Sequence, residues 1–257
     1  MRLVVKIGTS TIAYPTGGLN IRHMETLCKV LSDLKNSGIE VILVTSGAIG
    51  MGVGKLGLSG RPSDMPTKQA CAAVGQCELM YVYDRMFSEY NHTAAQILIT
   101  GSILKHYDRM ENFTNTLNRL LELGALPIIN ENDTIETQEI VIGDNDTLAA
   151  VVAAAANADL LVLLSDVDGL YSRDPETQKF NGVISEVDEI TPEIEAIAGG
   201  KGSGLGTGGM VTKVRAAQMC MDYGCDMIIS NGNKPELLYN VSEGVPFGTR
   251  FRSHKKD

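Results

Sequence analysis

The sequence predicts an α/β fold, a three-layer αβα sandwich in which a mainly parallel central sheet lies between two layers of helices. Two observations carry this prediction. Short runs of consecutive apolar residues recur along the chain without alternating polar positions, which is typical of parallel strands buried on both faces. Segments with helical spacing of apolar residues separate these runs, so strands and helices alternate along the whole sequence.

The first half of the chain has clear start and stop signals. Asn20 is a suitable N-cap for a helix that ends near Gly38. Pro66 suits the first turn of a later, longer helix. Residues 47–60 are rich in glycine, and we expect a loose segment there. The predicted strands are residues 3–7, 41–44, 94–99 and 126–129, and the helices between them span about 20–37, 66–90 and 108–123.

The second half continues the alternation. An alanine-rich helix is predicted over residues 144–156, and a wholly apolar strand follows at 160–164. Residues 166–182 carry several Asp-Gly, Asp-Pro and Asn-Gly turn signals, so we expect a loop there. The remaining predicted elements are helices at about 191–198 and 210–223 and a strand at 227–230.

Composition narrows the class of protein. With 257 residues, 44% of them apolar, the chain can bury a full core, and no linker divides residues 1–257 into separate domains. A net charge of −9 argues against nucleic acid as a partner. The longest apolar run, residues 148–156, is too short to cross a bilayer, so we expect no membrane partner.

The cysteines and histidines carry no recognisable site. Five cysteines without a C-x-x-C pair indicate reduced side chains in a cytoplasmic protein. The histidines show no metal-ligand or triad spacing, and we expect no metal site and only surface or capping roles for them. They are His23, His92, His106 and His254.

Polar residues and glycines gather where predicted strands end. In parallel α/β sheets, ligands bind at the carboxyl ends of the strands. Five strands of this chain end in such residues, which is more than turn formation alone requires. We therefore place a ligand site along that edge of the sheet. The residues concerned are Lys6 and Gly8, Ser46 and Gly47, 130–133, Ser165 and Asp166, and Asn231.

Two lysines lie in glycine-rich turns far apart in the sequence. Lys6 ends the first strand just before Gly8, and Lys213 falls in the first turn of the helix that follows residues 202–209. Fixed ammonium groups and backbone N–H groups at a helix start bind phosphate. The alternatives are a solvated lysine and a flexible loop, but both lysines together in an acidic chain favour a phosphate site. No Walker P-loop pattern occurs.

Two clusters of carboxylates and amides accompany the lysines. Asn-Glu-Asn-Asp at 130–133 and Gly-Asp-Asn-Asp at 143–146 could hold an ammonium group, orient the lysines, or bind Mg²⁺ together with phosphate. Helix capping would explain only one of the polar residues in the second cluster. Ser165, Asp166 and Asp168 could contact a nucleotide base or ribose, or could simply form a turn.

Taken in chain order, six segments resemble the amino-acid kinase superfamily and, within it, the glutamate 5-kinase family. Four of the segments are shared in looser form across the superfamily, whereas the pair at 130–133 and 143–146 points to glutamate as the acceptor. The resemblance covers essentially the whole chain and corresponds to the form without a C-terminal PUA domain. The segments are residues 6–10, 44–49, 130–133, 143–146, 166–171 and 204–210.

The resemblance implies the amino-acid kinase fold and an enzyme that uses ATP to phosphorylate the side-chain carboxylate of L-glutamate, the first step of proline biosynthesis. The product would be L-glutamyl 5-phosphate, and Mg²⁺ would arrive with ATP. The N-terminal part would bind the acceptor, and roughly residues 160–257 the nucleotide. The implied partners are proline as a feedback inhibitor, a glutamyl phosphate reductase that takes the product, and further copies in a homodimer or homotetramer.

The resemblance also implies roles for individual residues. The implied catalytic residues are Lys6, Lys213 and Asp146, the last of which would orient the lysines. The implied glutamate-binding residues are Ser46, Gly47, Asp133 and Asn145. The implied ATP-binding residues are Lys6, Gly8, Ser165, Asp166, Thr207, Gly208, Gly209, Met210, Val211, Thr212 and Lys213.

Two other functions stay open at this point. One is another kinase of the same fold, such as an N-acetylglutamate or UMP kinase. The other is a nucleotide-binding regulator without turnover. The two lysines and Asp146 favour an enzyme, because a protein that only binds nucleotide does not need charges around a transferring phosphoryl group.

Overall fold

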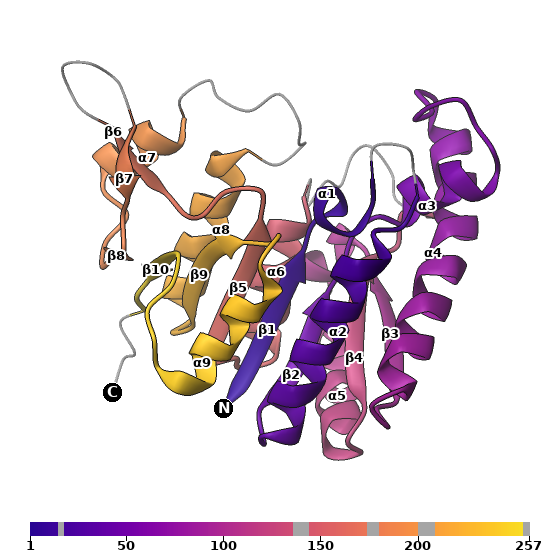
Figure 1. The fold of residues 1–257 in the computed structure, drawn as a ribbon, viewed down its shortest axis with the longest axis horizontal. Helices are drawn as coiled ribbons and strands as arrows, with labels where there is room; N and C mark the ends of the chain where they lie inside the picture. Colours follow the sequence, from indigo (N-terminus) through magenta and orange to yellow (C-terminus); the bar gives the residue numbers. More distant parts are fainter. Residues whose placement is uncertain (15–17, 136–143, 174–179, 200–208, 254–257) are drawn as a thin grey trace.

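A computed structural model of the chain describes residues 1–14, 18–135, 144–173, 180–199 and 209–253. Its central feature is an eight-stranded sheet, accompanied by the small antiparallel hairpin β6 (Tyr171–Arg173) and β7 (Phe180–Val183) (Figure 1). The sheet contains β1 (Arg2–Ile7), β2 (Glu40–Val44), β3 (Ala94–Ile99), β4 (Leu126–Glu131), β5 (Leu160–Ser165), β8 (Glu186–Val187), β9 (Asp226–Asn231) and β10 (Thr249–Phe251).

The strands follow the order β3-β4-β2-β1-β5-β9-β10-β8. Pairing is parallel throughout this sheet except between β9 and β10, as far as the described residues show. β1 lies in the middle, with Lys6 beside Val44 of β2 on one side and Leu163 of β5 on the other. The predicted mainly parallel sheet is confirmed, and it places Lys6 at the centre of the carboxyl edge.

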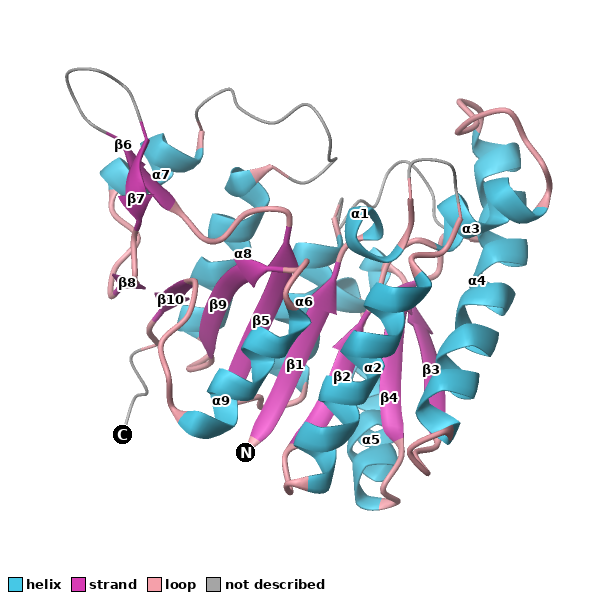
Figure 2. Cartoon of the chain, in the orientation of Figure 1, coloured by secondary structure: helices cyan, strands magenta, loops and turns pink. Residues whose placement is uncertain are grey.

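Helices cover both faces of the sheet (Figure 2). One face packs against α2, α4 and η2, and the other against α5, α6 and α8, which confirms the three-layer sandwich. None of the described helices is long and apolar enough to cross a membrane. The helices are α1 (Thr9–Ile12), α2 (Ile21–Asn36), α3 (Ala48–Lys55), α4 (Met65–Ser88), α5 (Tyr107–Glu122), α6 (Asn145–Ala155), α7 (Pro192–Ala198), α8 (Met210–Asp222) and α9 (Tyr239–Glu243), with 3₁₀ turns η1 (Gly101–Lys105) and η2 (Pro235–Leu238).

The central strands are mostly apolar because both of their faces are covered. Successive side chains of a strand point to opposite faces. In β1, Leu3 and Val5 therefore join the hydrophobic cluster under α2, while Val4 joins the cluster under α6. All six residues of β5 are buried. Each central strand thus contributes apolar area to two cores at once.

The predicted helix ends are confirmed by their capping contacts. The Asn20 side chain accepts a hydrogen bond from the backbone N of His23 at 3.3 Å and begins α2. Asp144 accepts one from the backbone N of Thr147 at 2.7 Å and begins α6. Gly38 follows α2 with φ of 94°, a backbone conformation that glycine adopts without strain.

Three expectations from the sequence were wrong. The glycine-rich residues 47–60 are not loose throughout, since α3 forms there and packs closely on α4. The stretch 166–182 is not only a loop, since it contributes β6 and the start of β7. His23 is neither a surface nor a capping side chain: it is 8% exposed, and its Nε2 has no hydrogen-bond partner among the described residues.

Two glycines make the contact between α3 and α4 possible. A Cβ atom built on Gly75 would lie 1.7 Å from the carbonyl oxygen of Ala48, and one built on Gly52 would lie 1.9 Å from that of Cys71. Both distances are far below contact distance, and both neighbours are backbone atoms that cannot rotate away. The backbones therefore touch at positions where only glycine fits.

We expect Gly75→Ala to lower the free energy of unfolding by about 2 kcal/mol, because the added methyl group overpacks the contact and displaces the start of α3. Gly60→Ala is the matched control, since a Cβ there meets no atom within 4 Å; it should change stability by less than about 0.5 kcal/mol. Urea denaturation of both variants measures the difference. Equal stability of the Gly75→Ala variant and the wild type would contradict the close packing of α3 on α4.

Candidate active site

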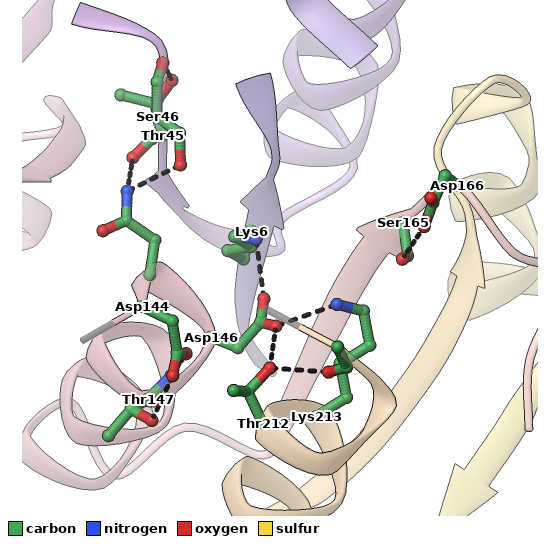
Figure 3. A network of polar contacts seen from close by, with 12 residues as sticks. Lys6, Thr45, Ser46, Asp144, Asp146, Thr147, Ser165, Asp166, Thr212 and Lys213 are labelled. Atoms are coloured by element: carbon green, nitrogen blue, oxygen red, sulfur yellow. Dashed lines mark hydrogen bonds and ion pairs between the residues drawn. The ribbon is translucent and has the colours of Figure 1, made fainter. Parts of the chain in front are cut away.

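Three charged side chains meet at the carboxyl edge of the sheet (Figure 3). Lys6 comes from the end of β1, Asp146 from the first turn of α6, and Lys213 from the first turn of α8. Asp146 Oδ1 lies 2.6 Å from Lys6 Nζ, and Asp146 Oδ2 lies 2.9 Å from Lys213 Nζ. The sequence separation is large, but the parallel topology brings all three predicted catalytic residues together.

The cluster is buried and carries excess positive charge. Lys6 is 9%, Lys213 7% and Asp146 2% exposed. Two ammonium groups share one carboxylate, so the three side chains carry a net charge of +1 in a place where water screens poorly. An anionic ligand is the natural complement of such a site.

Asp146 stays ionised although it is buried. Burial alone would raise the pKa of this carboxyl group, but the charges and hydrogen bonds of Lys6 and Lys213 outweigh burial and hold the pKa below its usual range. A lowered folded-state pKa means that ionised Asp146 stabilises the fold above the ordinary aspartate range. This contribution is lost as the pH falls through the lowered pKa.

Gly8 leaves room beside the lysine. It is the N-cap residue of the short helix α1, directly after β1. A Cβ atom on Gly8 would lie 3.7 Å from Lys6 Nζ and 4.0 Å from Ser10 Oγ. The missing side chain therefore keeps the space next to the ammonium group open for a ligand.

A second polar group surrounds the start of α3. Asn145 Nδ2 lies 2.7 Å from the carbonyl oxygen of Thr45, 2.6 Å from Ser46 Oγ and 3.2 Å from Asn130 Oδ1. Gly47 has φ of 100° and caps α3. This left-handed backbone conformation favours glycine, and a Cβ atom at Gly47 would also lie 2.9 Å from the end of the Ile12 side chain, at Cδ1. Three of the predicted glutamate-binding residues, Ser46, Gly47 and Asn145, are thus brought together.

Asp133 lies in the turn that follows β4 and lines a small cavity beside this second group. The cavity reaches the first residue of α3 and a buried face of α4. Asp133 therefore joins the acceptor side of the predicted site, whereas residues 136–143, including Gly143, lie outside the described part of the chain. The lining residues are Ala48, Ala72, Gln76, Leu98, Glu131, Asn132, Asp133 and Thr134.

The predicted nucleotide-binding residues occupy the other half of the same edge. The Ser165 hydroxyl donates to Asp166 Oδ1 at 3.0 Å at the end of β5 (Figure 3). Gly209 caps α8, and the Thr212 hydroxyl lies 3.1 Å from Asp146 Oδ2 and 2.8 Å from the Gly209 carbonyl oxygen. Met210 is half-buried and Val211 is 46% exposed. Thr207 and Gly208 lie outside the described residues.

Sequence reasoning did not select two residues that the structure places in the polar network. Asn130 was noted only as part of a motif, and Gln76 was not noted at all. Asn130 Nδ2 donates to Gln76 Oε1 at 2.9 Å, and both side chains are buried. A glutamine within the apolar face of α4, between Ala72 and Leu79, is the sequence signal that could have identified Gln76.

Comparison with known proteins gives the family. Residues 1–231 match the model of the amino acid kinase family. Proteins called glutamate 5-kinase from Clostridium perfringens and Listeria monocytogenes are each 50% identical to the chain; the alignments cover 99% and 100% of this chain and 96% and 94% of those proteins. A Clostridium acetobutylicum protein of the same name is 50% identical over 97% of this chain and 94% of its own length.

Solved structures show the same fold at low identity. An isopentenyl phosphate kinase from T. acidophilum has a TM-score of 0.65 at 18% identity and covers 98% of this chain and 100% of its own. A carbamate kinase from Giardia lamblia has a TM-score of 0.69 at 17% identity, with 98% coverage of both chains. The chain therefore belongs to the amino acid kinase family and, within that family, to the group of its glutamate 5-kinase relatives.

Proposed function

We propose that this protein transfers the γ-phosphoryl group of ATP to the side-chain carboxylate of L-glutamate, which gives L-glutamyl 5-phosphate and ADP. The single observation that carries the proposal is the buried Lys6–Asp146–Lys213 cluster, whose excess positive charge lies where the strands of the sheet end. Relatives that share half of the sequence and carry the name glutamate 5-kinase support the choice of acceptor.

The chemistry needs positioning and charge more than proton transfer. A carboxylate is already a competent nucleophile, so no general base is required. The barrier lies in bringing two anions together and in stabilising negative charge on the group in flight. Lys6 and Lys213 would flank the transferring phosphoryl group, and Asp146 would fix both ammonium groups in place.

The two substrates would approach from opposite halves of the edge. Glutamate would contact Ser46, Gly47, Asp133 and Asn145, which lie near the start of α3 and the end of β4. ATP would contact the segment from roughly residue 160 onward, which includes Ser165, Asp166 and the start of α8. Bound Mg²⁺ would neutralise charge on the ATP phosphates, and the protein would add few ligands of its own.

We expect Asp133→Ala to raise the glutamate KM by about tenfold while the ATP KM changes little, because the carboxylate lines the acceptor side only. Steady-state kinetics with each substrate varied in turn measures both values. Asp64→Ala is a control, since Asp64 is exposed and its carboxylate caps the start of α4. An unchanged glutamate KM in the Asp133→Ala variant would remove this residue from the acceptor site.

A panel of acceptors tests the proposed function. ADP release with Mg·ATP is measured for glutamate, N-acetylglutamate, aspartate and UMP at equal concentrations. The proposal predicts ADP release that depends on glutamate. Turnover of another acceptor instead would identify a kinase of the same family with a different substrate. Nucleotide binding without turnover of any acceptor would indicate a regulator.

The same function has consequences for partners. An acyl phosphate is labile, so direct hand-off to a glutamyl phosphate reductase in the cytoplasm would protect it. We also expect proline to compete with glutamate, as a feedback inhibitor would, and the chain to form a homodimer or homotetramer. For proline, the expected result is inhibition at millimolar proline that is relieved when the glutamate concentration is raised.

A further inference from the structure

We propose that Gln76 is a positioning residue of the acceptor site, because it accepts the hydrogen bond that holds the side-chain amide of Asn130 in contact with Asn145. The proposal rests on the function proposed above. Gln76 belongs to α4, is 8% exposed, and lies among the residues that line the cavity beside Asp133.

A series of four amides connects the surface to the acceptor site. Gln76 Nε2 donates to Oε1 of the exposed Gln96 at 3.2 Å. Asn130 Nδ2 donates to Gln76 Oε1 at 2.9 Å, and Asn145 Nδ2 donates to Asn130 Oδ1 at 3.2 Å. Each amide donates toward Gln96, so all the contacts run in the same direction.

Two backbone groups determine this direction. The backbone N of Glu131 donates to Asn130 Oδ1 at 2.9 Å, and a flipped Asn130 amide would place its own NH₂ against that N–H. The carbonyl oxygen of Thr45 accepts from Asn145 Nδ2, and a flipped Asn145 amide would place two oxygens together. Backbone atoms cannot flip, so the polarity of the series is fixed rather than arbitrary.

The direction decides what Asn145 offers to a ligand. Its two N–H hydrogens are shared among three acceptors, the Thr45 carbonyl oxygen, Ser46 Oγ and Asn130 Oδ1. Its carbonyl oxygen has no hydrogen-bond donor in the described part of the chain, and that oxygen is the atom left for the acceptor. A carbonyl oxygen binds a protonated amino group, which favours acceptors with a free ammonium group over N-acylated ones.

Gln76 supplies the acceptor that Asn130 needs. Asn130 is 2% exposed, so its NH₂ group cannot turn to bulk water. Without Gln76 Oε1 this donor would be buried without an acceptor, which is unfavourable. Rotation of Asn130 toward another partner would break its contact with Asn145. Loss of Gln76 should therefore weaken glutamate binding, while Lys6 and Lys213 keep their ion pairs with Asp146.

Gln76→Leu tests the proposal, because it removes the amide and keeps most of the side-chain volume. We expect the glutamate KM to rise about tenfold, with kcat and the ATP KM within about threefold of the wild type. Gln96→Leu is the matched control, because the amide of Gln96 lies at the exposed end of the series, where water can replace it. Its glutamate KM should stay within about threefold. Gln76→Met replaces Gln76→Leu if the latter does not fold.

A double variant shows whether Gln76 acts through Asn130. If it does, Asn130→Ala combined with Gln76→Leu has the glutamate KM of Asn130→Ala alone. Equal rises of the glutamate and ATP KM in Gln76→Leu, or effects of the two substitutions that multiply, would overturn the proposal. If the wild type phosphorylates another acceptor of the panel, the KM values of the same variants for that acceptor test the role of Gln76. If it phosphorylates none, this inference fails together with the proposed function.

Discussion

Replacing either lysine of the central cluster with methionine should lower kcat by at least about 100-fold, which is the typical effect of losing one group that stabilises the transition state. Methionine keeps the apolar stem of Lys6 or Lys213 and removes only the ammonium group. Both ammonium groups lie within 3 Å of Asp146 and are fixed by it, so neither can take over the position of the other.

The control for this loss is a lysine with a similar contact far from the cluster. Lys55 Nζ lies 2.9 Å from Glu78 Oε2 in an exposed ion pair between α3 and α4. Lys55→Met should leave kcat within about twofold, because exposed ion pairs contribute little. Initial rates at saturating Mg·ATP and glutamate measure all three variants. Near-normal kcat in Lys6→Met or Lys213→Met would show that the residue has no part in the transfer step.

Asp146→Asn should impair both stability and turnover. It leaves two ammonium groups buried side by side without a counter-charge, and breaking a buried ion pair in this way costs about 3 kcal/mol or more. Turnover should fall by about 100-fold or more as well, since the lysines lose the group that orients them. Glu78→Gln removes the carboxylate of the exposed Lys55 pair and should change stability by less than about 1 kcal/mol.

The dependence of stability on pH shows whether the charge of Asp146 is responsible for the stabilisation. In the wild type, the contribution of ionised Asp146 should be lost as the pH falls below about 4 toward its lowered pKa. The Asp146→Asn variant has no such group, so its stability should depend less on pH in that window. Urea denaturation of both proteins between pH 7 and pH 3 measures the difference. Parallel curves would contradict the assignment of the lowered pKa to Asp146.

Much of the fold could be predicted because burial on both faces leaves a strong pattern in the sequence. The strands β1, β2, β4 and β5 each contain at least three consecutive apolar residues, and caps such as Asn20 and Asp144 mark helix starts. Strands β8 and β10 have only two and three residues, too few to show a period. Helix α3 was missed because its glycines disfavour helices in isolation, whereas in the fold Gly52 permits close contact with the backbone of Cys71 in α4.

Site residues could be predicted where they lie together in one short motif. They could not be predicted where their contacts depend on how distant segments pack. Asp144, Asn145 and Asp146 are consecutive, yet they cap the helix, contact Ser46 and bind the lysines, respectively. Successive residues of a helix point about 100° apart, so three consecutive side chains can contact three different partners. Gln76 meets Asn130 across 54 residues, and only the packing of α4 on the sheet reveals that contact.

The most direct test of the account follows an oxygen atom. Glutamate labelled with ¹⁸O in the side-chain carboxylate is incubated with Mg·ATP and hydroxylamine, and the released phosphate is analysed by mass spectrometry. If the carboxylate attacks the γ-phosphorus, hydroxylamine then cleaves the C–O bond, and each phosphate carries one ¹⁸O atom alongside glutamyl hydroxamate. Unlabelled phosphate released together with ADP would mean that water is the acceptor, and would contradict phosphoryl transfer to glutamate.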